Sequence, residues 1–316
     1  MRPRWLVAGL ATAVTVGAVV LAVRSTDKIP FARSETCGAT VDGTFVELDP
    51  EQAKFASLIA ATATRRGMPA RATTIGIATA YQESKIRNID YGDRDSVGLF
   101  QQRPSQGWGT AAQIMNPRYS IGKFFDGLQK VDGYTELEVT EAAQAVQRSA
   151  FATAYADHEE DARVLASALS GNSPAAFSCQ VRSPESDGAP EGADGLTPRA
   201  AEVLAFVEKA FGEQSTGGYA PGGVDTGHIE GSAHYEGRAV DFFFRPVDAD
   251  SLRSGWALAQ YVVANARQLG VRTVIYDARI WTARRSDEGW RDYRVPDRAG
   301  DPDVLAHRDH VHVDVA

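Results

Sequence analysis

The 316-residue sequence has no run of basic residues, no internal repeat and only two cysteines. Its formal net charge is −8. Because a basic patch is absent, the composition argues against a nucleic acid as the partner. The hydrophobic content of 43% allows sizeable cores, and the length allows two domains of ordinary size.

Long apolar runs are also scarce, and one stands out, from Trp5 to Val23, after the basic start MRPR. It has no charged residue and is about as long as a membrane-spanning helix. A secretory signal shares the charged start but usually has a shorter apolar core and a small-residue cleavage site. Since no clean A-x-A site follows, we favour a transmembrane signal anchor over residues 1–24 and keep a cleaved signal as the alternative. Either interpretation places the bulk of the chain outside the cytoplasm, on the cell membrane or secreted.

The two cysteines, Cys37 and Cys179, flank one candidate domain, before its first helix and after its last. In an oxidising compartment this arrangement predicts a disulfide that ties the ends of the domain together. Two unpaired buried thiols are the alternative.

The first half of the chain reads as mostly helical. We expect a linker over residues 25–47 and a mostly α domain over residues 48–180. Its first helix begins with Asp49 as cap and Pro50 in the first turn, and Gly67 ends it. Helical patterns follow around residues 70–85, 116–131, 140–151 and 157–169, and no strong strand is predicted between residues 48 and 170.

The second half reads as an α+β domain. Residues 181–196 are rich in Pro, Gly, Ser and acids, which predicts a flexible linker. The domain that we expect over residues 197–316 contains a helix, a glycine-rich loop, a strand, a helix and two further strands. These are predicted at residues 197–211, 217–231, 239–244, 248–270, 272–281 and 310–315.

A glutamate ends the second predicted helix, in IATAYQESK, and the loop VGLFQQ follows it. This combination resembles the lysozyme-like soluble lytic transglycosylases, in which an E-S pair and a G-L-M-Q-like motif line a cleft for peptidoglycan glycan. The resemblance covers about residues 48–170, with Phe100 where the family commonly has Met. It implies Glu83 as the catalytic acid/base. It also implies that the following positions shape the cleft or contact substrate: Ser84, Gly98, Leu99, Gln101 and Gln102.

Glycoside cleavage gives Glu83 a chemical purpose, because a carboxylic acid kept protonated by an apolar wall can protonate the leaving oxygen. A hydrolase would usually need a second carboxylate, and Asp90, Asp93 and Asp95 are nearby. A lytic transglycosylase manages with one, because a hydroxyl of the sugar replaces water. An exposed helix-end charge is the plainer interpretation of Glu83. Trp108 can stack on a sugar ring or anchor its loop.

Five of the six histidines lie after residue 227. In the last strand, HVHVDV, side chains alternate, so His310, His312 and Asp314 share one face and valines share the other. With His234 and Asp241 upstream, these side chains suggest a zinc cluster. Catalytic zinc takes three His, Asp or Glu ligands and leaves a position for water. A turn histidine and a strand-end acid are the structural alternative for His234 and Asp241.

The stretch SAHYEGRAVDF fits the S-x-H-x-x-G-x-A-x-D pattern of the zinc D-alanyl-D-alanine carboxypeptidases, a group related to Hedgehog proteins and lysostaphin-type peptidases. HRDHVHV supplies their closing H-x-H motif. The resemblance covers about residues 197–316. It implies Zn²⁺ on His234, Asp241 and His312 with the fourth position open. It also implies that His310 acts in catalysis and that His307 can assist.

Two features depart from that family. The glutamate that many members carry before the closing histidine is missing, so a histidine or Asp309 would act as base. The arginine of a G-Y-R motif is missing too, since residues 218–220 read GYA; this leaves room for an endopeptidase. Arg238 can substitute or remain solvated. His228 fits no motif position and is expected to be a loop residue.

Both implied substrates, glycan strands and peptide stems, occur in peptidoglycan. The sequence therefore predicts a membrane-anchored, extracytoplasmic peptidoglycan hydrolase with a lysozyme-like domain and a zinc-peptidase-like domain. A non-catalytic cell-wall-binding or scaffold protein is the rival, motivated by the missing glutamate and arginine. A small-ligand carrier has no positive support in the sequence.

Overall fold

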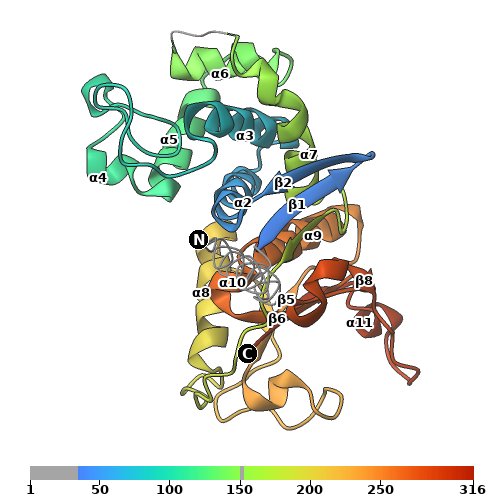
Figure 1. The fold of residues 1–316 in the computed structure, drawn as a ribbon. Helices are drawn as coiled ribbons and strands as arrows, with labels where there is room; N and C mark the ends of the chain where they lie inside the picture. The colour runs from blue at the N-terminus through green and yellow to red at the C-terminus, as the bar shows by residue number, and fades with distance from the viewer. Residues whose placement is uncertain (1–34, 150–152) are drawn as a thin grey trace, which may run out of the picture. The chain divides into compact units, whose positions relative to one another are not determined.

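The structure, a computed structural model, describes residues 35–149 and 153–316 (Figure 1). The apolar stretch expected to be a signal anchor lies outside these residues. Among those described, none of the helices has the length and apolar character needed to cross a membrane. Glu35–Ala316 group by their contacts into one compact unit.

The helical part is organised around α3, which is buried along most of its length and contacts α2, α5, α6 and α7. Helix α2 begins as the sequence predicts. Asp49 accepts hydrogen bonds from the backbone N–H groups of Glu51 and Gln52, and Pro50 is the first residue of the helix. The helices of this part are α2 (Pro50–Arg65), α3 (Ala70–Ser84), α4 (Ala111–Ile114), α5 (Pro117–Leu128), α6 (Val139–Gln147) and α7 (Glu159–Leu169). Two short 3₁₀ helices accompany them, η1 (Pro104–Gln106) and η2 (Ala156–His158).

Part of the expected linker over residues 25–47 is a β-hairpin in the structure. Strands β1 (Thr36–Val41) and β2 (Thr44–Leu48) pair antiparallel around Asp42 and Gly43, which both have positive φ angles, 50° and 85°. An Asp-Gly pair between strands is typical of a two-residue hairpin turn, a signal that the composition of the segment had hidden.

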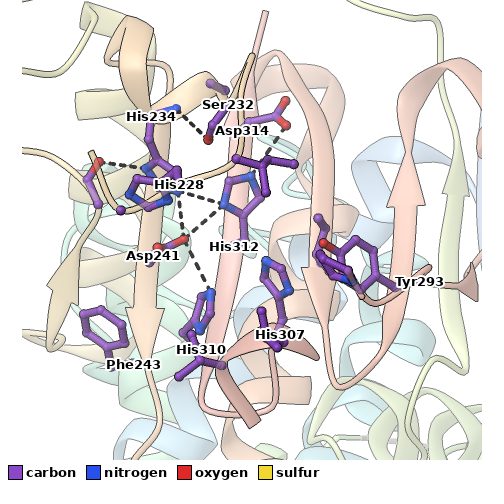
Figure 2. Close-up of a pocket in the computed structure, with 18 of the residues that line it drawn as sticks. His228, Ser232, His234, Asp241, Phe243, Tyr293, His307, His310, His312 and Asp314 are labelled. Atoms are coloured by element: carbon purple, nitrogen blue, oxygen red, sulfur yellow. Dashed lines mark hydrogen bonds and ion pairs between the residues drawn. The ribbon is translucent and has the colours of Figure 1, made fainter. Parts of the chain in front are cut away.

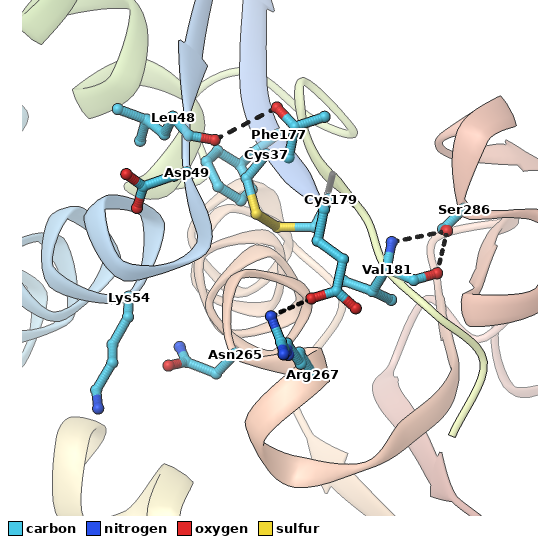
Figure 3. The surroundings of a disulfide bond; sticks show 12 residues. Cys37, Leu48, Asp49, Lys54, Phe177, Cys179, Val181, Asn265, Arg267 and Ser286 are labelled. Atoms are coloured by element: carbon cyan, nitrogen blue, oxygen red, sulfur yellow. Dashed lines mark hydrogen bonds and ion pairs between the residues drawn. A yellow bond between two sulfur atoms is a disulfide. The ribbon is translucent and has the colours of Figure 1, made fainter. Parts of the chain in front are cut away.

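The predicted disulfide is present (Figure 3). Strand β3 (Phe177–Gln180) pairs with the other side of β1, so the sheet order is β2-β1-β3. In this register Cys37 lies directly opposite Cys179, and the bond joins the first strand of the helical part to its last.

The C-terminal part contains an antiparallel sheet of order β4-β5-β9-β6-β7-β8 among the described residues. One expected strand, residues 272–281, is a hairpin of two strands, because Asp277 and Ala278 both adopt positive φ and turn the chain. Helices α8 and α9 contact the sheet, and the valines of β9 are buried beneath them, as the alternation predicts. The strands are β4 (Thr216–Gly217), β5 (Ala239–Phe243), β6 (Val271–Tyr276), β7 (Arg279–Thr282), β8 (Arg291–Asp292) and β9 (His310–Val315). The α-helices are α8 (Pro198–Phe211), α9 (Ala249–Ala264), α10 (Ala266–Leu269) and α11 (Pro302–Leu305), and the 3₁₀ helices are η3 (Ala233–Glu236) and η4 (Ala283–Glu288).

The helical part and the sheet part share one hydrophobic core. The expected flexible linker, residues 181–196, runs between β3 and α8 without a helix or strand. Helix α9 nevertheless packs on α2, α7 and β3. Its Gln260 is fully buried, accepts a hydrogen bond from Phe177 N at 2.7 Å and donates to Ala168 O at 2.6 Å. The two parts are therefore held together by buried polar contacts as well as apolar packing.

We expect Gln260→Leu to lower the free energy of unfolding by about 2–4 kcal/mol, because two buried backbone groups lose their hydrogen-bond partner. Urea unfolding measures this, with Gln129→Leu at an exposed position as the matched control. Equal stabilities of the two variants would contradict the assigned role of Gln260.

Candidate functional site

The register of β5 against β9 places Asp241 directly opposite His312. His234 reaches the same point from η3, a short turn that begins at Ser232, whose hydroxyl accepts a hydrogen bond from the His234 N–H. The three side chains point into one pocket of about 500 Å³ (Figure 2). Histidine and aspartate far apart in sequence are thus brought together by strand pairing and one turn.

The donor atoms of His234, Asp241 and His312 lie close to one another. His234 Nε2 is 3.0 Å from His312 Nδ1 and 3.2 Å from Asp241 Oδ1, and His312 Nδ1 is 3.0 Å from the same oxygen. Donors bound to one tetrahedral zinc ion at about 2.0–2.1 Å lie roughly 3.3 Å apart. The observed spacing is close to this value, so these residues fit a metal ion.

Outer contacts orient both histidines. His234 Nδ1 donates to Gly218 O at 2.7 Å, which directs Nε2 at the centre. His312 Nε2 lies 3.7 Å from Asp314 Oδ2. Gly218 has a φ of +81°, and a Cβ there would lie 2.3 Å from the His234 ring, so the site requires glycine at this position.

The electrostatics of the cluster favour a cation. Burial opposes ionisation of Asp241, but hydrogen bonds from His234 and His312 and their charges keep its pKa well below the usual range. Burial also opposes a charged His312, yet Asp241 and Asp314 outweigh it and raise the pKa of His312 to about 9. The cluster therefore retains a proton at a point where a metal cation can take its place.

His310 faces the cluster from β9 and is held from behind. Its Nε2 lies 3.9 Å from Asp241 Oδ1, and its Nδ1 donates to Asp309 Oδ1 at 2.6 Å. Asp309 in turn accepts two hydrogen bonds from Arg245, at 2.8 and 2.5 Å. Of the two base candidates, His310 thus faces the centre, whereas Asp309 lies behind it and orients its ring.

His307 lies beside His310 in the same pocket, with ring centroids 4.6 Å apart. Its backbone has a positive φ of 54°, and its ring packs nearly perpendicular to that of Tyr293. Burial, reinforced by the neighbouring histidines, lowers the pKa of His307 to about 3. The ring is therefore neutral at physiological pH.

His228 is the residue that motif comparison missed. Its ring stacks on that of His234, with centroids 3.9 Å apart and an interplanar angle of 22°. One nitrogen of His228 lies within 4.8 Å of donor atoms of His234 and Asp241, and these three residues form a group that could hold a metal ion. The glycine-rich loop before His234 was the sequence feature that could have indicated the position of His228, because such a loop can bend back over the turn that carries His234.

Arg238 does not take the place of the missing G-Y-R arginine, because its side chain has other partners. Arg238 donates to the Glu236 carboxylate and to Val315 O, at 2.7 and 2.8 Å. Arg245 and Arg298 line the pocket instead, and Arg245 is paired with Asp309.

A second candidate site surrounds Glu83 at the end of α3. Tyr155 Oη donates to Glu83 Oε1 at 2.7 Å, and Gln147 also hydrogen-bonds the carboxylate. Burial raises the pKa of Glu83 despite these two bonds. Glu83 is therefore a half-buried acid with ordered partners rather than an exposed helix-end charge.

Side-chain hydrogen bonds hold the loop that follows Glu83. Ser84 Oγ donates to Leu99 O at 2.8 Å, and Gln101 donates to Gly98 O at 3.2 Å. Gln102 is only 2% exposed and donates to Ser120 O, so we assign it to support of the loop rather than to substrate contact.

Trp108 lines a separate pocket of about 600 Å³ together with Gln147, and it also packs against the core. Gln147 also hydrogen-bonds Glu83, so one residue connects this pocket with the acid. Of the carboxylates considered as a partner for Glu83, Asp95 is engaged by Arg103 and Ser105, whose hydrogen bonds hold its pKa well below the usual range.

Comparison with known families gives one result for the C-terminal part. Residues 192–303 match the family model described as VldE, C-terminal domain. The match covers about a third of the chain. It includes His228, His234 and Asp241 and ends before strand β9, which carries His310 and His312. A search of curated proteins found no match.

Proposed function

We propose that the chain is a membrane-anchored, extracytoplasmic peptidoglycan-remodelling protein whose β5–β9 face is a zinc-dependent peptidase centre. The convergence of His234, Asp241 and His312 within 3.0–3.2 Å of one another carries this proposal. Two imidazoles and one carboxylate suit zinc, and three protein ligands are typical of a catalytic zinc site.

Zinc bound there would lower the pKa of water and polarise a peptide carbonyl. His310 would hold or move a proton at Nε2, because Asp309 and Arg245 keep its Nδ1 protonated and its ring fixed. Ile229, Ile275 and Val304 line the pocket and would receive apolar parts of a peptide substrate.

We further propose that residues 48–180 are a lysozyme-like domain that cleaves glycan strands with Glu83 as general acid. Support comes from its burial, its raised pKa and the hydrogen bonds from Tyr155 and Gln147. Hydrolysis and lytic transglycosylation both use such an acid, and their products differ.

The test is digestion of purified peptidoglycan by the zinc-loaded full chain, with the zinc content measured by mass spectrometry. New free amines would identify peptide cleavage, new reducing ends glycan hydrolysis, and anhydro-sugars transglycosylation. Absence of zinc would overturn the metal assignment. Zinc uptake and wall binding without any product would favour the scaffold alternative.

Glu83→Gln is expected to reduce glycan cleavage by about 10²–10⁴-fold, because general acid catalysis contributes that much. The amide retains the hydrogen bond from Tyr155, so folding is preserved. Since the pKa of Glu83 is raised, ionisation costs stability as pH rises. The variant should therefore be at least as stable as the wild type at neutral pH, and the difference should shrink as pH falls through the pKa of Glu83.

Glycan-fragment release and thermal unfolding at several pH values measure these effects. Glu141→Gln, at an exposed position of α6, is the control. Unchanged fragment release by Glu83→Gln would exclude Glu83 as the acid.

A further inference from the structure

A further histidine, His228, lines the pocket, and specific hydrogen bonds fix the position of its backbone. Its backbone N–H donates to Tyr235 Oη at 3.0 Å, and the same hydroxyl donates to His228 O at 2.7 Å. Tyr235 directly follows His234 on η3. The loop that carries His228 is therefore tied to the turn that carries His234.

The side chain of His228 has freedom that its backbone lacks. Gly227 precedes it with a φ of +93°, and a Cβ added to that glycine would meet no atom within 4 Å. His228 is half-buried, and its ring stacks on that of His234 (Figure 2). Rotation about the Cα–Cβ and Cβ–Cγ bonds can thus move the ring while Tyr235 holds the backbone.

In the stacked position the His228 ring covers the His234 ring, but the nitrogen atoms of the two rings do not point at the same place. Nitrogen lone pairs lie in the plane of an imidazole, so two nearly parallel rings 3.9 Å apart cannot both aim at one ion. One His228 nitrogen is nevertheless within 4.8 Å of the donor atoms of His234 and Asp241. Shared tetrahedral coordination needs a spacing of roughly 3.3 Å, so the His228 nitrogen has to move by at most about 1.5 Å as its ring turns toward the centre.

We propose that His228 is a displaceable fourth protein ligand of the metal centre. This inference rests on the proposed metal site. With His228 bound, the centre has four protein donors and is closed; with the ring stacked on His234, the fourth position is free for water or substrate. Exchange between the closed and the open state requires only that the His228 nitrogen leaves the metal as an oxygen of water or substrate binds. In the zinc-loaded protein without substrate the centre is closed, and a substrate that fills the pocket opens it.

X-ray absorption spectroscopy at the zinc edge tests this directly, because it counts bound imidazoles. The zinc-loaded wild type should show three imidazole ligands and His228→Ala two. His158→Ala should keep three, since His158 lies on η2 against Tyr81 and Gln82. Competition with a chromophoric chelator should show zinc affinity about tenfold weaker, or more, in His228→Ala.

Tyr235→Phe gives a second, milder variant, because it removes only the hydroxyl that holds the His228 backbone. It should weaken zinc binding less than His228→Ala. Two imidazoles in the wild type, with unchanged affinity in His228→Ala, would overturn the role of His228 and leave the three-ligand centre standing. Failure of the wild type to bind zinc would overturn the proposed function as well, so the two failures are distinguishable.

Discussion

His312→Ala is expected to abolish zinc binding, from about one ion per chain to a small fraction of that. His312 Nδ1 is 3.0 Å from both other donor atoms, so its removal takes away one of the three donors that converge at the centre. Loss of an outer partner alone typically costs 10–100-fold in metal affinity, and loss of a direct ligand should cost at least about 100-fold. Release of amines from peptidoglycan should disappear with the metal.

The same substitution also removes a partner of the buried Asp241 carboxylate. Breaking a buried charged pair costs about 3–5 kcal/mol, so His312→Ala should also be less stable without metal. His312→Gln replaces the imidazole by a polar group of similar size and separates metal loss from unfolding. Zinc analysis by mass spectrometry, with circular dichroism to confirm folding, provides the measurement. A folded His312→Gln protein with wild-type zinc affinity would refute the assignment.

Asp314→Asn supplies the graded comparison for this experiment. It changes the outer contact at His312 Nε2 and leaves the three donors in place. Zinc affinity should fall by about 10–100-fold, between the wild type and His312→Ala. His158→Ala, in the helical part, should leave the affinity unchanged.

The Cys37→Ala/Cys179→Ala double variant is expected to lose about 2–5 kcal/mol of unfolding free energy. The disulfide closes a loop with a sequence separation of 142, which greatly restricts the unfolded chain. It also fixes β1 to β3 at the boundary between the helical part and the sheet part, where Trp281 Nε1 donates to Cys179 O at 3.2 Å. The stability loss should therefore affect the whole unit of residues 35–316.

Urea unfolding with and without reductant measures this contribution. Reductant should destabilise the wild type to about the level of the double variant and leave the double variant unchanged. Both cysteines are nearly inaccessible, so the reductant must be present during unfolding. A wild type whose stability is insensitive to reductant under these conditions would contradict the assigned role.

Local sequence signals predicted the elements whose causes are local. Asp49, Pro50 and Gly67 mark the ends of α2, and the alternation in HVHVDV separates the valines from His310 and His312. Short-range signals were also missed where composition hid them, as at the Asp42-Gly43 turn. A polar segment with a two-residue turn can form a hairpin when a third strand and a disulfide support it.

Contacts between distant residues could not be predicted in this way. Tyr155 meets Glu83 across 72 residues, and Arg245 meets Asp309 across 64. Gln102, expected at a substrate cleft, turns inward because Ser120 O on α5 accepts its amide. Each of these contacts depends on how whole helices and strands pack together. The sequence of a single segment does not specify that packing.

The sequence by itself determined the helix caps, the faces of β9, the cysteine pair and the residue types that suit a metal ion. The tertiary structure alone decided that β5 and β9 pair with Asp241 opposite His312, and that Asp309 lies behind His310. It also decided that His228 lies on His234, through the hydroxyl of Tyr235. The reason is physical: caps and alternation act over a few residues, whereas donor atoms converge only through strand register and packing.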